Sequence, residues 1–463
     1  MISWQKTDLA TRWAIVVIGI GVLLRLVLAL VNLESNDDHL SVSRVIANEG
    51  RVPMRTEMVM AYHPKLWHAS VAMVWQLLPA TLSGEGQIKT AQLLNALAGS
   101  GVVIIAYAFI FKRRWQIPVK LIALSLVSFN PRLIGISAQA TNDSWAIFFG
   151  TAAVWLTIMF FETGRQKYFY QGMVMTVLMA LTKGGGLVLF AVLISTLLVE
   201  ALWWGKKRLV SQPRAVFLIL LVILIFCFIV IPLTPYWSDW MAEGEFFGPR
   251  YQVEPRPFWF KQTYGDRPGV TSIYDSFFTF RIEGLLQEPM ITLGNEEYPL
   301  HRTSYWSQLY GRFNFVHFER WPSSWELDTP FIRMVGRASM VLGLWPLGLF
   351  MFGIWRTGHD MIKKITRGEG LSSSTFFILL GVIAFLAAGV SYSINYRPFY
   401  AMKVIYILPV ILANVYLFGE AADIFYRRIR EVTRWQEVSN TVFVLLFIVH
   451  ITDITILCLQ LSK

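Results

Sequence analysis

Uncharged or nearly uncharged runs recur along the 463-residue chain, most of them about 17–21 residues long. A helix of that length crosses the hydrocarbon core of a bilayer. Hydrophobic residues make up 55% of the sequence, far above the share in a soluble domain. We therefore expect an all-α polytopic membrane protein. Its eleven predicted spans lie at about 13–33, 90–111, 117–130, 144–161, 168–182, 186–204, 215–233, 332–355, 374–392, 400–418 and 440–460.

Lysine and arginine are concentrated in alternate connectors between these spans. With eleven spans, all of these connectors fall on the same side as Lys6 and Arg12, as the positive-inside rule expects. This predicts a cytoplasmic amino terminus and an outer carboxyl terminus. The net charge of +11 then reflects cytoplasmic flanks, and we expect no nucleic-acid partner. The basic connectors are 111–115, 164–167, 205–214, 355–367 and 427–434.

The predicted topology leaves three segments on the outer side: 34–89, 130–144 and the aromatic-rich 234–331. It also divides the chain into a membrane module over 1–233, the long outer loop 234–331, and a second membrane module over 332–463. The two cysteines, Cys227 and Cys458, fall inside apolar spans, which excludes a disulfide framework or a cysteine-based metal motif.

Two juxtamembrane helices are predicted in the first outer segment. Polar Asp37, Ser41 and Arg44 recur at helical spacing, which indicates an amphipathic helix that runs to Gly50. The polar cluster at 35–37 is expected to cap this helix, and Gly50 to end it. A second surface helix is expected over 62–78.

Charged residues from distant parts of the sequence converge on the outer face in this topology. Each has a plainer explanation, because the acids could cap helices and the cations could snorkel from helix ends. Together, however, carboxylates and cations suit an acceptor hydroxyl and a phosphate, respectively. The residues concerned are Asp37, Asp38, Asp143, Lys183, Arg397 and Lys403.

The histidines give a weaker signal. His63 and His68 are five residues apart, about 140° around a helix, so they cannot share a metal as an i, i+4 pair does. A polar or stacking role is the expectation, and the metal question stays open. A divalent metal on the outer face would draw on His39, Glu57, His301 and His317.

The order of four segments resembles a known superfamily. These are "NDDHLSVSRVIANEGRVP", "YHPKLWH", "NPRLIGISAQATNDSW" and "LTKGG". Their series is similar to the GT-C polyprenyl-phosphate-dependent glycosyltransferases, especially family-39-like enzymes such as protein O-mannosyltransferases and lipid A aminoarabinose transferases. The resemblance covers about residues 12–233 and continues more loosely at 304–315 and 395–400.

The resemblance implies roles for particular residues. One of Asp37 and Asp38 matches the first-loop catalytic acid, with Asp37 preferred because it leads the pair on the polar stripe, and Asp143 matches the second-loop acid. Lys183 matches the lysine near the lipid phosphate. His63 and Pro64 match the start of an HPP segment in which this chain has Lys65 as the third residue. The remaining candidate substrate-binding residues are Arg44, Arg397 and Lys403.

The activity that follows from the resemblance is transfer of a sugar from a polyprenyl-phosphate donor to a lipid, glycan or protein hydroxyl. No cofactor is required, although a divalent metal stays open, and the bilayer is the other partner. The expected location is a bacterial inner membrane, with the site on the extracytoplasmic face. The aromatic stretch 312–325 is expected to cover the cavity and help select the acceptor.

Two other functions fit a polytopic chain. A transporter or lipid flippase requires ionisable residues in the middle of spans, and these are few, with Arg25 and Asp453 as the clearest cases. A non-catalytic assembly subunit gives no reason for acids on two separate outer loops.

Overall fold

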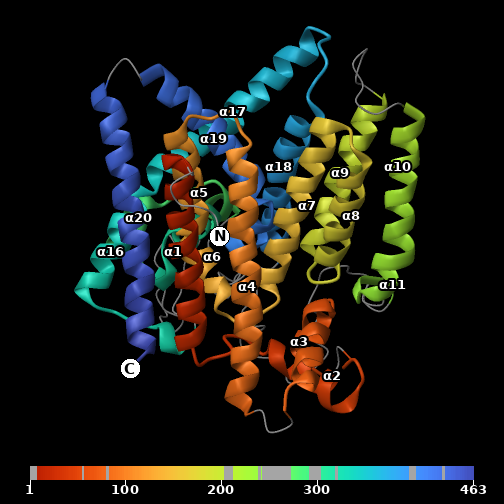
Figure 1. The fold of residues 1–463 in the computed structure, drawn as a ribbon, viewed down its shortest axis with the longest axis vertical. Coiled ribbons are helices and arrows are strands. Elements are labelled where there is room, and N and C mark those ends of the chain that lie inside the picture. Colours follow the sequence, from red (N-terminus) through yellow and green to blue (C-terminus); the bar gives the residue numbers. More distant parts are fainter. Residues whose placement is uncertain are drawn as a thin grey trace.

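The computed structural model describes ten stretches of the chain, and every regular element within them is helical. The helices form an upright bundle (Figure 1). The all-α membrane fold predicted from sequence is confirmed. The described residues are 8–54, 57–79, 83–202, 212–237, 241, 273–290, 304–318, 322–395, 403–429 and 433–463.

Within the described ranges, eight helical stretches are long and apolar enough to cross a membrane. Each coincides with one of the predicted spans, although their ends differ by several residues. They are α1 (Leu9–Val31), α4 (Gly84–Phe111), α7 (Asp143–Thr163), α10 (Gln212–Ile225) continued by η3 (Phe226–Val230) and α11 (Ile231–Leu233), α16 (Pro330–Leu342) continued by α17 (Leu344–Thr366), α18 (Ser373–Asn395), α19 (Ile411–Ile429) and α20 (Thr433–Leu461).

The three remaining predicted spans correspond to shorter or broken helices. Helices α5 (Ile117–Ser128) and α6 (Pro131–Ser137) are bent by 42° at a break and together form one candidate span. Helices α8 (Gln166–Ala180) and α9 (Gly185–Leu202) follow α7. The count of eleven spans therefore stays a prediction, although each predicted run is helical in the structure.

The tenth predicted span starts later than expected. The chain forms two 3-10 turns, η8 (Val404–Tyr406) and η9 (Leu408–Val410), before the α-helix begins at Ile411. Pro409 provides no N–H for an i→i−4 bond, so it stands in the first turn instead of the helix interior. The segment before α19 is thus left at the end of the bundle in a non-α conformation.

The first outer loop contains the two predicted surface helices, α2 (His39–Glu49) and α3 (Leu66–Leu77), at one end of the bundle (Figure 1). Gly50 ends α2 with φ 65°, a conformation that suits glycine. The predicted cap is wrong. Asp38 occupies the N-cap position without a side-chain cap bond, because Asn36 turns the chain at φ 70° and Asp37 Oδ1 accepts the N–H of Asp38 at 2.9 Å.

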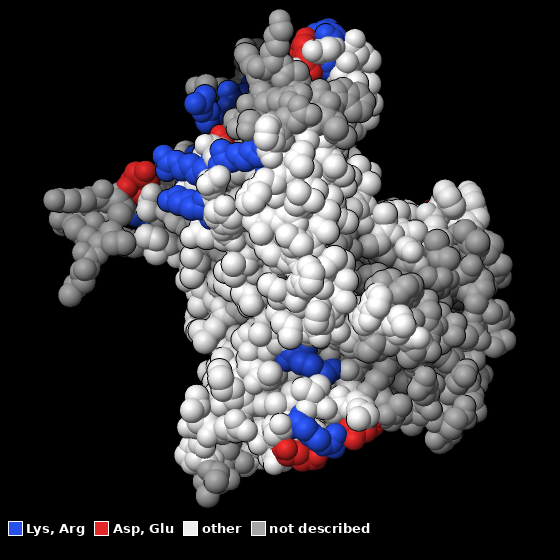
Figure 2. Space-filling model, turned by 90° about the vertical axis from the view of Figure 1, so that its right-hand side faces the viewer, with Lys and Arg blue, Asp and Glu red and all other residues white. Residues whose placement is uncertain are grey.

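Charged side chains are concentrated towards the two ends of the bundle on the face that Figure 2 shows. On the face in Figure 2, Lys and Arg side chains gather towards the upper end, an uncharged band lies below them, and a smaller charged group lies at the lower end. Helices α2 and α3 and the end of α20 lie at that lower end (Figure 1). These features support an integral, multi-pass membrane protein.

The charges predicted in mid-span are bound within the bundle. Arg25 is buried and donates to the backbone oxygens of Gly21 and Ser128, both at 2.8 Å. It thereby joins α1 to the break between α5 and α6. Asp453 is also buried and accepts from the N–H of Val316 at 2.7 Å, with His317 Nδ1 at 2.6 Å.

The long outer segment does not simply cover the bundle. Its described helices are α13 (Ile273–Phe277), α14 (Ile282–Gln287) and α15 (Tyr305–Asn314). Almost every side chain of α15 is buried, and Asn130, between α5 and α6, donates to Phe313 O at 2.9 Å. Helix α15 is therefore part of the interior.

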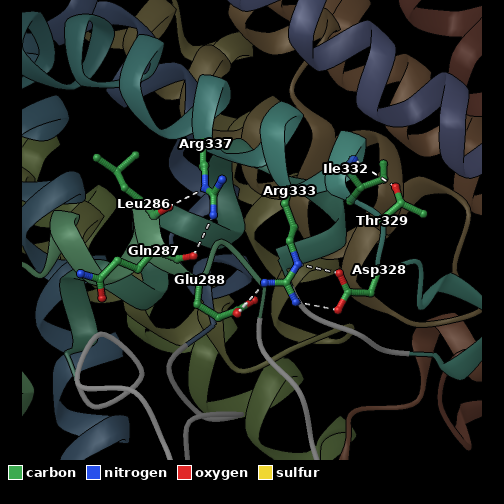
Figure 3. A network of polar contacts seen from close by, with 8 residues as sticks. All are labelled: Leu286, Gln287, Glu288, Asp328, Thr329, Ile332, Arg333 and Arg337. Atoms are coloured by element: carbon green, nitrogen blue, oxygen red, sulfur yellow. Dashed lines mark hydrogen bonds and ion pairs between the residues drawn. The ribbon is translucent and has the colours of Figure 1, made fainter.

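Figure 3 shows how α14 is held against the start of α16. Arg333 donates to both carboxylate oxygens of Asp328, at 2.7 and 2.8 Å, and to Glu288 at 2.9 Å. Arg337 donates to the last carbonyls of α14, which lack partners inside that helix. These are Leu286 O at 2.7 Å and Gln287 O at 3.2 Å.

The main hydrophobic core includes residues from both predicted membrane modules. Ala14 and Phe160 from the first module share it with Leu412 and Phe443 from the second. The four helices after the outer loop thus pack on the first seven spans as one bundle. The division into modules stays a prediction from sequence position.

Candidate active site

Two buried asparagines fix the loops at the lower end of the bundle. Asn95 of α4 donates to Gln139 O at 2.5 Å and Thr141 O at 2.7 Å, and it accepts from the indole of Trp67 at 2.9 Å. Asn142 donates to Thr182 O at 2.9 Å. Because all these groups are shielded from water, leaving one unpaired would be costly. The connector before α7 and the turn after α8 are thereby held together.

Asp143 and Lys183 meet on this frame. Lys183 Nζ donates to Asp143 Oδ1, and Thr141 Oγ1 lies 3.3 Å from Asp143 Oδ2. The two charged side chains keep 19% and 13% of their surface exposed. Residues 40 positions apart thus form one ion pair, as the predicted convergence of these two residues required.

The glycines after Lys183 make the turn possible. A Cβ at Gly186 would collide with the backbone nitrogen of Ala180. Only a residue without a side chain allows α9 to start so close to the end of α8. The glycines of "LTKGGG" therefore permit the tight turn that holds the ammonium group of Lys183 beside Asp143.

Tyrosines line the other side of Lys183. Its Nζ lies 5.6 Å from the centre of the Tyr406 ring, within the range of a cation–π contact. Tyr392 contacts the same ring, with centroids 5.1 Å apart. Burial raises the pKa of Tyr406 well above its ordinary value, so the hydroxyl stays protonated and can donate a hydrogen bond. Tyr406 belongs to η8, in a segment that was predicted as part of a span.

Three histidines gather beside the ion pair. His39 Nδ1 lies 3.1 Å from His68 Nε2, and the rings of His39 and His63 stack at 4.9 Å. Burial lowers the pKa of His39, and it lowers the pKa of His63 and His68 further, so neutral imidazoles are favoured. The histidines thus make both a polar contact and a stacking contact.

The first-loop acids flank this cluster. His39 lies in the electrostatic field of Asp37, Asp143, Lys183 and Asp38. Asp37 is half-buried, whereas Asp38 is exposed. Asp37 and the Asp143–Lys183 pair thus both lie close enough to His39 to act on it electrostatically.

The other predicted site residues are arranged differently. Arg44 is exposed and binds Gln87 of α4 at 3.2 Å. Lys65 donates to the backbone oxygens of Ala61 and His63 and so helps to shape the turn before α3. Lys403 is half-buried and acts electrostatically on Asp143. Arg397 lies outside the described residues.

The metal ligands proposed from sequence are separated in the structure. Glu57 binds Arg51 at 2.8 Å, and His317 binds Asp453. His301 lies outside the described part of the chain. Among the residues that are described, no three metal-ligating side chains, the histidine cluster included, are arranged to hold a metal ion.

That the aromatic stretch 312–325 covers the cavity and helps to select the acceptor stays a prediction. In its described part, Phe315, Phe318 and Trp325 are at most 2% exposed and belong to hydrophobic clusters, so these three rings are not exposed for stacking on a sugar. Arg312 is also buried, with 1% exposed. Glu319 and Arg320 lie outside the described residues. The composition alone does not distinguish a surface belt from a buried helix.

The fold is similar to that of solved glycosyltransferases. The crystal structure of the Archaeoglobus fulgidus oligosaccharyltransferase in the apo form matches with a TM-score of 0.51 and 13% identity, over 100% of this chain and 57% of the other. AglB from the same organism, in complex with an inhibitory peptide and a dolichol-phosphate, matches with a TM-score of 0.52 and 14% identity, over 100% and 56%. This chain thus spans a little over half the length of these proteins.

A further structure, ArnT from Cupriavidus metallidurans bound to undecaprenyl phosphate, has 13% identity over 89% of this chain and 77% of the other. Its TM-score of 0.38 is too low to support a conclusion. A search among curated proteins found no match.

The bundle is thus similar in fold to the solved oligosaccharyltransferase structures. Over part of the chain, residues 48–238, the sequence matches the model of the family described as dolichyl-phosphate-mannose-protein mannosyltransferase. The matched stretch includes α3, the Asp143 loop and the Lys183 turn, and it ends after the seventh predicted span.

Proposed function

We propose that the protein transfers a sugar from a polyprenyl-phosphate donor to a hydroxyl group at the extracytoplasmic face. The observation that carries this proposal is the partly exposed Asp143–Lys183 pair, which buried amides hold at the loop end of the bundle. The family match over this segment supports it. So does the similarity in fold to an enzyme that was solved with a dolichol-phosphate.

In the proposed reaction the cations bind the donor phosphate. A bond forms between the acceptor oxygen and the anomeric carbon, while the bond from that carbon to the phosphate oxygen breaks. The lipid leaves as polyprenyl phosphate, whose negative charge Lys183 stabilises, with Lys403 and Arg397 as further candidates. Direct displacement of this kind inverts the anomeric centre.

A carboxylate takes the proton that the acceptor hydroxyl loses. Asp37 is the proposed base, because it is half-buried near His39 and forms no ion pair among the described residues. Asp143 is engaged by Lys183, and an ion-paired carboxylate is a weaker base. It becomes the second candidate once the donor phosphate competes for Lys183.

The two charged residues that suggested a transporter have structural partners instead. Arg25 and Asp453, the charges expected to mark a transport path, are buried and bound to backbone groups and His317. Groups held in this way stabilise the bundle.

The decisive experiment incubates the purified full-length protein with a panel of polyprenyl-phosphate sugars and measures which donor is consumed. We expect one donor class to be converted to free polyprenyl phosphate, and Asp37→Asn to abolish the conversion. A protein that consumes no donor, but moves a lipid-linked sugar across vesicle membranes, would be a flippase instead.

A further inference from the structure

A second polar site lies at the end of the bundle opposite α2 and α3. The chain between α4 and α5 forms an open pocket of about 580 Å³ against the end of α19, in the size range of small-molecule sites. No acidic residue lines it. The lining residues are Arg114, Trp115, Gln116, Ile117, Pro118 and Arg427.

Close packing shapes the wall of this pocket. Trp115 lies directly on Gly419 of α19, where a Cβ would collide with the indole ring. Its Nε1 donates to Glu420 at 2.8 Å. The buried ring therefore fixes the connector against α19, and its neighbours on the connector are positioned with it.

The charges of the pocket leave one arginine available. Arg427 donates to Asp423 at 2.7 Å, and that carboxylate also accepts the N–H of Gln116 at 2.7 Å. Arg114 is exposed, and its guanidinium has no partner among the residues that the structure describes. Asp423 is thus balanced by Arg427, and Glu420 is bound by the indole N–H of Trp115, so Arg114 is the lining cation that forms no ion pair among the described residues.

The apolar rim indicates what kind of anion fits. Ile117 is 46% exposed beside the arginines, at the end of a helix that belongs to a candidate span. A free anion has no apolar group to pack against Ile117, whereas a lipid carries acyl chains next to its phosphate. Basic pockets between helices at the cytoplasmic side of membranes are suited to anionic headgroups.

We propose that this pocket binds the phosphate group of an anionic membrane lipid, with Arg114 and Arg427 as its ligands. The site is separate from the Asp143–Lys183 pair, since it lies at the opposite end of α4 (Figure 1). Because guanidinium groups bind phosphate through paired N–H donors, a lysine would replace Arg114 incompletely.

The test measures the midpoint of thermal unfolding of the full-length protein in detergent. Short-chain phosphatidylglycerol is titrated, and phosphatidylcholine and inorganic phosphate serve as comparison ligands. We expect phosphatidylglycerol to raise the midpoint by about 2–4 °C. In Arg114→Gln, half of the effect should require about tenfold more lipid, the loss expected when a charge-assisted hydrogen bond is removed.

The matched control is Arg165→Gln, an exposed arginine in another basic connector that does not line the pocket. It should respond as the unmodified protein does. Equal responses of Arg114→Gln and Arg165→Gln would overturn the proposal. If inorganic phosphate reproduces the Arg114-dependent shift at the same concentration, the site takes free phosphate and the lipid assignment is wrong. The measurement does not depend on sugar transfer, so its result can be judged independently of the proposed glycosyltransferase activity.

Discussion

At the scale of single residues, the neighbouring acids Asp37 and Asp38 form a natural control pair. Asp37 is half-buried near His39, whereas Asp38 is exposed and makes no side-chain cap bond. We expect Asp37→Asn to reduce transfer by about 10²–10⁴, the usual contribution of a general base, and Asp38→Asn to be milder. Thermal unfolding of both variants should stay close to that of the unmodified protein. Full activity in both would move the base to Asp143.

Lys183 has two roles that a double variant separates. It neutralises Asp143, and we propose that it also binds the donor phosphate. Lys183→Ala should therefore weaken donor binding, measured with a labelled polyprenyl-phosphate sugar. In Lys183→Ala combined with Asp143→Asn, the carboxylate that Lys183 neutralises is removed together with the lysine. Binding should stay weak if the lysine contacts phosphate, and it should recover if the lysine only balances the acid.

The buried histidines predict a pH dependence of stability. Burial lowers the pKa of His68 well below its ordinary value near 6.5. As the pH falls below that value, the unfolded chain binds a proton that the folded protein resists, so stability falls. We expect the thermal midpoint to decrease from pH 7 to pH 5, and less so in His68→Gln. An equal decrease in both proteins would assign the effect to other groups.

At the scale of elements, the turn between α8 and α9 depends on glycine. Gly186→Ala should lower the thermal midpoint and weaken donor binding, because the new methyl group pushes α9 away from Ala180 and moves Lys183. The loss of stability should be about 1–3 kcal/mol, as for other overpacked sites. Gly381→Ala in α18 is the control, since open space surrounds that position. Equal midpoints in the two variants would contradict this account of the turn.

The elements also show what sequence reasoning could reach. Hydrophobic run length located the spans, and the Gly50 stop and the glycines after Lys183 were visible as local signals. The start of α19 was misplaced because apolar residues continue through two 3-10 turns, where Pro409 interrupts the hydrogen bonding. The burial of α15 could not be foreseen, because an aromatic, polar segment suits a membrane interface and a protein interior equally well.

At the scale of the whole molecule, the orientation can be tested by labelling. Single cysteines at positions 320 and 365 are introduced after Cys227 and Cys458 are replaced. We expect an impermeant reagent to label position 320, but not 365, from outside. The opposite pattern would invert the bundle and place the Asp143–Lys183 pair in the cytoplasm.

The site as a whole was predictable only in part. Topology brought Asp37, Asp143 and Lys183 to one end, and the structure places the latter two in contact. The contact between His39 and His68 spans 29 residues and depends on how α2 packs on α3, which no local pattern reveals. Tyr406 was missed because it lay inside a predicted span.

The buried position of α15 has a consequence for biosynthesis. Helix α15 is made after the entire stretch that matches the family model, and yet Asn130 of that stretch is bound to Phe313 in the finished protein. The packing around Asn130 therefore cannot be completed until residues 304–318 have been synthesised. A chain that stalls before that point would leave Asn130, at the break between α5 and α6, without the backbone oxygen that it binds in the finished protein.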